Sequence, residues 1–349
     1  MKLLTQFLLF IFAISTIFLF DACKKDNNSN PEDTIELPDL KAEMMTLSAI
    51  AYTAESHSID LIKDSILFHL ADSSLATGAK WELVWGPGVS SNNENLSYVV
   101  KNSSGSNPQF AVVIRGTNST SLVDILEDVD VFVLSEFPYG LPGDSVCRGS
   151  MNGFNYLLNA KDMVEGTTLE VFLESVTTTT RTPVYVTGHS QGGGLCPLMA
   201  YWLTTHDSFK EKFLCSTFGF ASPGWVNKSF RDNFLAAMPA DATYNSYVNT
   251  LDLVPYGYSM LPQIIERNIP VHVPFAYRIL ISAFDSILTA KGIRYYNVVI
   301  ADSIGNIPIT ASAPGGLTPA DTISWYNHWL GVEHNRNNYL KLLDAEPVN

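Results

Sequence analysis

The feature that most constrains the fold is a stretch in the middle of the chain, residues 182–199, which reads TPVYVTGHSQGGGLCPLM. Residues 183–187 are apolar and rich in β-branched side chains, which predicts a buried strand. A Gly-x-Ser-x-Gly turn centred on Ser190 follows at once, and apolar residues then recur at helical spacing. A strand, a tight turn that carries a serine and a helix together form the layout of a nucleophile elbow.

This layout suits a reactive serine. A sharp strand-to-helix turn forces Ser190 into a strained backbone conformation, and Gly188 and Gly192 leave room for it because they have no Cβ. The free N–H groups at the start of the helix face any oxyanion that forms beside the serine. The competing interpretation is a structural glycine turn, since the pentapeptide by itself is a weak signal.

The composition of the 349-residue chain allows a substantial core, because 46% of the residues are hydrophobic and 16% are charged. The net charge is −14, and no basic stripe is available to neutralise phosphates, so we expect no nucleic-acid partner. Predicted strands alternate with predicted helices along the chain. This alternation predicts an α/β fold with a mainly parallel central sheet flanked by helices.

The N-terminus has the pattern of an export signal. A basic start precedes an apolar segment, residues 8–20, that is too short to span a membrane. Residues 19–23 (LFDAC) resemble a bacterial lipoprotein signal, in which the cysteine, here Cys23, becomes the lipidated first residue. We therefore expect residues 1–22 to be a lipoprotein-type signal peptide. The alternative is an ordinary signal peptide with Cys23 as a free thiol.

Residues 23–38 are polar and cannot bury a core, so we expect a disordered tether before a folded domain at residues 39–349. Lipidation at Cys23 implies an exported, membrane-anchored protein. We expect it in the outer membrane, facing the periplasm or the cell surface. Cys147, Cys196 and Cys215 remain, an odd number that allows one disulfide and a free thiol and shows no metal-ligand spacing.

Hydrophobic patterning predicts further elements on both sides of the serine turn. Helices are expected at residues 40–54 and 59–75, and a single broken helix is expected within residues 149–180. Strands are expected at residues 81–85, 96–101, 110–114, 215–220 and 246–248, with turns over 86–95. Residues 119–129 form a candidate lid. The apolar segment 256–316, with a helix near 277–288, is either an ordinary excursion of the fold or a wall over the site.

A serine hydroxyl needs a base to take its proton and a third group to orient that base. In sheets of this kind the partners follow in the order serine, acid, histidine. Asp252 comes directly after a predicted strand, where a loop leaves the carboxyl edge of the sheet. His206 is too close to the elbow helix to reach back, and His328 and His334 are nearly equal candidates for the base.

Five segments in order resemble the class 3 lipases, also called fungal-type lipases, of the α/β-hydrolase superfamily. The resemblance extends over residues 49–343. The segments are VVIRGT at 112–117, GHSQGG at 188–193, GFASP at 219–223, VN and DLVP within 248–255, and His334 followed by YLKLL at 339–343. Gln191 stands where the family usually has leucine. Each segment is weak by itself, but the ordered set is specific.

The resemblance implies an α/β-hydrolase fold and a role for individual residues. It implies Ser190 as the nucleophile, Asp252 as the orienting acid and His334 as the general base. It also implies that the backbone N–H groups of Thr117 and Gln191 hold the oxyanion.

Asp128 matches the acidic position after the family's short lid helix. The resemblance implies that Asp128 buttresses the site, and a solvated helix charge is an equal alternative. His328 is then expected to be a packed or surface histidine.

The implied activity is ester hydrolysis through an acyl-enzyme, with no metal and no cofactor. We expect triacylglycerol or another lipid as the substrate, and a phospholipase A1 or a small-ester carboxylesterase is the alternative. A different class of function is a non-catalytic surface lipoprotein that binds a lipid or a glycan. The expected partners are the substrate and the membrane, reached through the lipid anchor, and no obligate protein partner is implied.

Overall fold

The structure is a computed structural model, and it describes residues 40–53, 58–90, 94–116, 130–178, 181–266, 273–299, 302–304, 315 and 318–349. Residues Asp39–Asn349 form one compact unit. No helix in the described ranges is long and apolar enough to cross a membrane. The predicted signal peptide, tether and lid, and with them Cys23, Thr117 and Asp128, lie outside the described residues.

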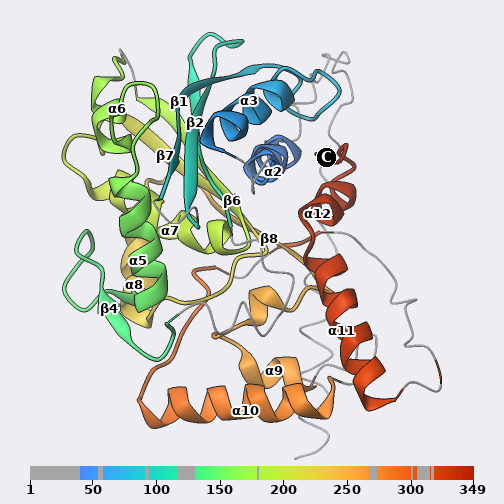
Figure 1. The fold of residues 1–349 in the computed structure, drawn as a ribbon. Coiled ribbons are helices and arrows are strands. Elements are labelled where there is room, and N and C mark those ends of the chain that lie inside the picture. Colours follow the sequence, from blue (N-terminus) through green and yellow to red (C-terminus); the bar gives the residue numbers. More distant parts are fainter. Residues whose placement is uncertain are drawn as a thin grey trace, which may run out of the picture. The chain divides into compact units, whose positions relative to one another are not determined.

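A seven-stranded sheet lies at the centre of the described part of this unit (Figure 1). In spatial order its strands are β1 (Trp81–Val89), β2 (Leu96–Asn102), β3 (Gln109–Ile114), β6 (Thr182–His189), β7 (Phe213–Phe220), β8 (Tyr244–Asn249) and β9 (Asp302–Ile304). The first three strands pair antiparallel, and the strands from β3 to β9 pair parallel. The mainly parallel sheet predicted from the sequence is confirmed. Its parallel strands bring their carboxyl ends to one edge, where sites of α/β sheets lie.

Helices cover both faces of this sheet (Figure 1). The helices are α2 (Leu40–Ile50), α3 (Ile59–Leu70), α5 (Arg148–Asn159), α6 (Leu169–Ser175), α7 (Gln191–Thr205), α8 (Lys228–Ala237), α9 (Leu261–Glu266), α10 (Phe275–Ala290), α11 (Pro319–His334) and α12 (Arg336–Leu342). A short helical turn, η1 (Val254–Tyr256), follows β8, and β4 (Leu134–Glu136) pairs with β5 (Ser145–Cys147) in a small separate sheet.

Alternate residues of the central strands point into two different cores, as the two-residue period of a strand requires. In β3, Val112 and Ile114 belong to the core under α5, α7 and α8. Ala111 and Val113, their neighbours, belong to the core under α2, α3 and α12. Because the central strands are buried on both faces, they read as continuous apolar runs in the sequence.

The structure corrects several boundaries expected from the sequence. The first strand continues through residues 86–89, which were expected to turn. The segment 149–180 contains two separate helices, α5 and α6, instead of one broken helix. The predicted helix near 277–288 is confirmed as part of α10. Strands β4, β5 and β9 have three residues each, too few to show a period in sequence.

Candidate active site

Ser190 lies between the end of β6 and the start of α7, in the tight turn that the sequence predicts. Its backbone has φ 60° and ψ −127°, a strained conformation for a residue with a side chain. The backbone holds this conformation through two hydrogen bonds. The Ser190 N–H donates to the carbonyl of Phe220 at 2.9 Å, and the N–H of Gly194 donates to the carbonyl of Ser190 at 3.0 Å.

Two glycines beside the serine are required because backbone fills the space where a Cβ would lie. A Cβ at Gly192 would lie 2.2 Å from the carbonyl oxygen of Ile114. A Cβ at Gly188 would lie 2.4 Å from the carbonyl carbon of Gly192. The turn therefore brings β3, β6 and the start of α7 into closer contact than side chains permit.

His334 is the last residue of α11, and its imidazole lies between Ser190 and Asp252. Its Nε2 is 2.8 Å from the Ser190 Oγ, and its Nδ1 is 2.8 Å from the Asp252 Oδ2. All three residues are buried. A carboxylate at Nδ1 favours the tautomer with the proton on that nitrogen, which leaves Nε2 free to accept the serine proton.

Asp252 follows β8 and is 1% exposed, so its negative charge depends on hydrogen bonds made inside the protein. Besides the contact with His334, its Oδ1 accepts from the backbone N–H of Val254 at 2.9 Å. Its Oδ2 accepts from the hydroxyl of Tyr339 at 2.7 Å. Burial, and then the charge of Asp252, raise the pKa of Tyr339 well above its ordinary value, so the phenol stays protonated and remains a donor.

Asn249, the last residue of β8, connects the acid loop to the helix that carries the base. Its side-chain oxygen accepts from the N–H of Leu251 at 3.0 Å, and its amide nitrogen donates to the carbonyl of Glu333 at 3.0 Å. Its backbone N–H donates to the Tyr339 hydroxyl at 3.0 Å. Because Glu333 immediately precedes His334, these bonds fix the base relative to the acid.

Tyr52, just after α2, reaches the other side of the serine turn. Its hydroxyl donates to the carbonyl of His189 at 3.1 Å and accepts from the N–H of Gly116 at 3.1 Å. One hydroxyl therefore joins the end of β6, next to the nucleophile, to the turn after β3. The Arg336 guanidinium lies over the same ring, 5.0 Å from its centroid.

His189, immediately before the serine, packs against the ring of His334 with centroids 4.8 Å apart. Its Nδ1 is 3.2 Å from the Tyr52 hydroxyl. Burial, and then the neighbouring His334 and Arg336, lower the pKa of His189 well below its ordinary value. A neutral His189 places no second full charge beside an imidazolium that forms at His334.

The structure brings together the three side chains that the resemblance implied, Ser190, Asp252 and His334. Gln191 is the first residue of α7 and immediately follows the serine. The other candidate bases take no part in this group. His328 is exposed on α11, and His206 lies 3.3 Å from Glu170.

The sequence predicts no role for Tyr52 or His189, and it indicates Tyr339 only as part of a motif. Tyr52 ends a helical apolar stretch and looks like any core aromatic residue, so no local signal could have identified it. Tyr339 offered one signal, because it stands at a fixed distance after His334 in the matching pattern.

The three cysteines in the described residues are free and buried, so the disulfide that the sequence allowed is not formed among them. Burial raises the pKa of Cys147 to about 11 and that of Cys215 to about 12. These thiols are therefore unreactive at neutral pH. Within the described ranges, no group of three or more histidine, cysteine, aspartate or glutamate side chains could hold a metal ion.

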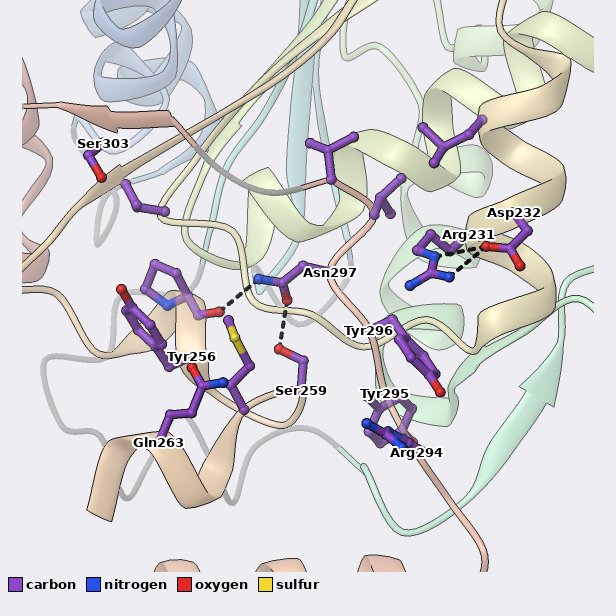
Figure 2. A pocket seen from close by; sticks show the side chains of 16 residues that line it. Arg231, Asp232, Tyr256, Ser259, Gln263, Arg294, Tyr295, Tyr296, Asn297 and Ser303 are labelled. Atoms are coloured by element: carbon purple, nitrogen blue, oxygen red, sulfur yellow. Dashed lines mark hydrogen bonds and ion pairs between the residues drawn. The ribbon is translucent and has the colours of Figure 1, made fainter. Parts of the chain in front are cut away.

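A cavity of about 860 Å³ opens beside the loop that carries Asp252. Figure 2 shows its two sides. On one side, Asn297 donates to the carbonyl of Pro255 at 3.2 Å. On the other side, the Arg231 guanidinium lies over the ring of Tyr296, 4.8 Å from its centroid. Ser190 does not line this cavity, which therefore adjoins the acid loop and not the serine itself.

Residues 111–260 match the family model described as lipase (class 3). This segment contains most of β3, the serine turn and Asp252, and it ends before α11, the helix that carries His334. A search of curated protein sequences found no match.

Solved lipase structures align with this chain, and the M37 lipase shares its fold. The M37 lipase aligns with a TM-score of 0.71 and 22% identity, covering 88% of this chain and 95% of that one. The lipase of Rhizopus microsporus var. chinensis aligns with a TM-score of 0.46 and 18% identity, over 62% of this chain and 69% of that one. The Rhizomucor miehei lipase in its propeptide complex aligns with a TM-score of 0.44 and 20% identity, over 62% of each chain. Residues 111–260 therefore match the class 3 lipase family, and the described domain has the α/β-hydrolase fold that it shares with the M37 lipase.

Proposed function

We propose that the protein hydrolyses lipid esters, with Ser190 as nucleophile, His334 as general base and Asp252 as the acid that orients the base. The observation that carries this proposal is the continuous hydrogen-bond chain from Asp252 Oδ2 through His334 to Ser190 Oγ, with 2.8 Å at each step. The strained turn at Ser190 adds to it, since strain of this kind is concentrated at reactive positions.

In the first half of the reaction, the Ser190 Oγ attacks the ester carbonyl carbon while its proton moves to the His334 Nε2. Asp252 stabilises the imidazolium that forms. The tetrahedral intermediate then collapses, and the bond between the carbonyl carbon and the alcohol oxygen breaks. The proton on Nε2 passes to that oxygen, so an alcohol leaves and the acyl group stays on Ser190.

In the second half, water takes the place of the alcohol. His334 accepts a proton from the water as its oxygen attacks the acyl carbon, and it returns a proton to Ser190 Oγ as the acid leaves. His334 is therefore neutral again at the end of each half, as it was at the start.

We assign the oxyanion donors to the backbone N–H groups of Gln191 and Thr117. A donor of this kind contributes roughly 3 kcal/mol to transition-state stabilisation. The Tyr52 hydroxyl supports both halves of this arrangement, because it bonds His189 two residues before Gln191 and Gly116 immediately before Thr117. Tyr52 is therefore a positioning residue for the oxyanion site.

We propose triacylglycerol or another lipid as the substrate class, with phospholipase A1 or small-ester carboxylesterase activity as the alternative. The lipases found among the structural neighbours support a lipid substrate. A non-catalytic lipid- or glycan-binding role is disfavoured, since a protein that only binds has no need of a buried acid, base and hydroxyl in register.

We also propose that the protein is exported and attached to the outer membrane through a lipid on Cys23. The apolar segment 8–20, which ends just before this cysteine, supports the proposal. A tether at residues 23–38 would leave the hydrolase free to reach lipid at the membrane to which it is attached.

Replacing the nucleophile should abolish hydrolysis. We expect Ser190→Ala to lower kcat for p-nitrophenyl esters by roughly 10³-fold or more, because the acyl-enzyme can no longer form. Ser216→Ala is a matched control, since Ser216 is a buried serine on the neighbouring strand β7. Assays with esters of graded chain length also report the acyl preference. Equal rates for Ser190→Ala and wild type would refute the proposal.

Removing the Tyr52 hydroxyl should loosen the oxyanion site while the ring stays in place. We expect Tyr52→Phe to lower kcat roughly tenfold and to leave KM nearly unchanged, since the lost support acts in the transition state. Tyr98→Phe removes another buried hydroxyl that bonds α2, at the carbonyl of Leu47, and should leave kcat unchanged. A similar kcat loss in both variants would show that α2 packing, and not the link to Gly116, is responsible.

A lipoprotein-type signal peptide predicts that Cys23 carries the acyl group. In a bacterial host that processes lipoproteins, radioactive fatty acid should label the wild-type protein, and Cys23→Ser should take up no label. Gel autoradiography of the purified proteins measures this directly. Label on the Cys23→Ser variant would contradict the assignment.

A further inference from the structure

Helix α10 has apolar side chains on two opposite faces. Its inner face is anchored in the protein through Tyr277, Ile281, Phe284 and Leu288, all of which are buried. The ring of Phe284 lies 5.1 Å from that of Phe132, and the Tyr277 hydroxyl donates to the Asn327 side chain of α11 at 2.6 Å. Burial of the inner face explains why the helix is stable. It does not explain why the outer face also carries apolar side chains.

The outer face exposes large apolar side chains in a line. Phe275 is 76% exposed, Ile279 55% and Ile287 41%, and Ala283 between them is also exposed. These four residues are four positions apart, so they form one stripe along the helix, here called the outer stripe. In Figure 1, α10 runs along the lower edge of the fold, beyond α9. Exposed apolar side chains in a continuous row mark a contact surface more often than scattered ones do.

The surroundings of the outer stripe are basic, although the whole chain carries a net charge of −14. Arg278, Lys291 and Arg294 are exposed beside or just beyond α10. Among the described residues, none of the three forms an ion pair with a carboxylate. Asp285, which is half-buried, is the acidic residue in the helix sequence. The segment 275–294 therefore has three cations against one carboxylate.

We propose that α10 docks on an anionic lipid surface, with the outer stripe inserted at the boundary between headgroups and acyl chains. An apolar helix face flanked by cations is the pattern of helices that lie in a membrane interface. Lysine and arginine side chains near an anionic surface strengthen binding to that surface. A second copy of the chain fits this surface less well, because a twofold contact through α10 would bring its cations toward one another.

Helix α3 shows why the charge matters. It also exposes apolar side chains, including Leu61 at 50% and Phe68 at 71%. Its exposed charged residues are Asp60 and Asp64, and Lys63 between them is half-buried, so the net charge of these three residues is negative and an anionic lipid surface repels it. Helix α3 is thus a matched control that has the apolar area without the net positive charge.

A fluorophore attached to the outer stripe tests the docking site locally. The full chain with Cys23→Ser and Ile279→Cys accepts a polarity-sensitive label at position 279, because the other three cysteines are buried. We expect its emission to shift to the blue with phosphatidylglycerol vesicles, and to be quenched severalfold by lipids that carry a spin label. The same label at Phe68→Cys should show little change, as should position 279 with phosphatidylcholine vesicles. The N-terminal segment is identical in every sample.

The proposal is overturned if the label at position 279 does not respond, or if positions 279 and 68 respond equally. Equal responses to anionic and zwitterionic vesicles also overturn it. A second measurement is independent of labelling. Phe275→Ser together with Arg278→Glu should weaken binding of the full chain to the anionic vesicles roughly tenfold and leave hydrolysis of a soluble ester unchanged. If this variant also lost soluble-ester hydrolysis, the substitutions would have damaged the active site or the fold, and the labelling experiment at positions 279 and 68 would then decide on the docking site.

Discussion

A buried carboxylate is the group on which the rest of the site depends. Asp252 is almost completely removed from water, and a charge in that position is tolerated only when hydrogen bonds replace the solvent. The backbone of Val254, the hydroxyl of Tyr339 and the ring of His334 supply them. Two of these donors restrain the carboxylate so that the third, the imidazole, is aimed at Ser190.

Residues from both ends of the described sequence support the site. Tyr52 follows the first described helix, α2, and Tyr339 lies in the last, α12. The Tyr52 hydroxyl bonds the residue before Ser190, and the Tyr339 hydroxyl bonds Asp252. The sheet supplies Ser190 and Asp252 from the ends of β6 and β8, two parallel strands on either side of β7, while the helices determine how accurately the groups are aligned. Alignment of this kind is worth several kcal/mol of activation energy in such enzymes.

Local sequence patterns predicted the parts of the fold in which the spacing of apolar residues changes abruptly from that of a strand to that of a helix. The strand, turn and helix around Ser190 could be read because an apolar run, two glycines and a helical spacing follow one another within 20 residues. The choice between His328 and His334 could not be made locally. They lie in the same helix, six residues and therefore about 240° apart, and only packing decides which face meets the sheet. Tyr52 was hidden for the same reason, since its partners are the ends of two distant strands.

The central claim is that His334 activates Ser190, and covalent labelling with a fluorophosphonate tests it most directly. The reagent reacts with a serine whose proton is taken by a base, and mass spectrometry of the digested protein identifies the modified residue. The account predicts one phosphonyl group on Ser190 of the wild-type protein, and labelling slowed by at least roughly 10³-fold in His334→Ala. Modification of a different serine, or equally fast labelling of Ser190 without the imidazole, would contradict it.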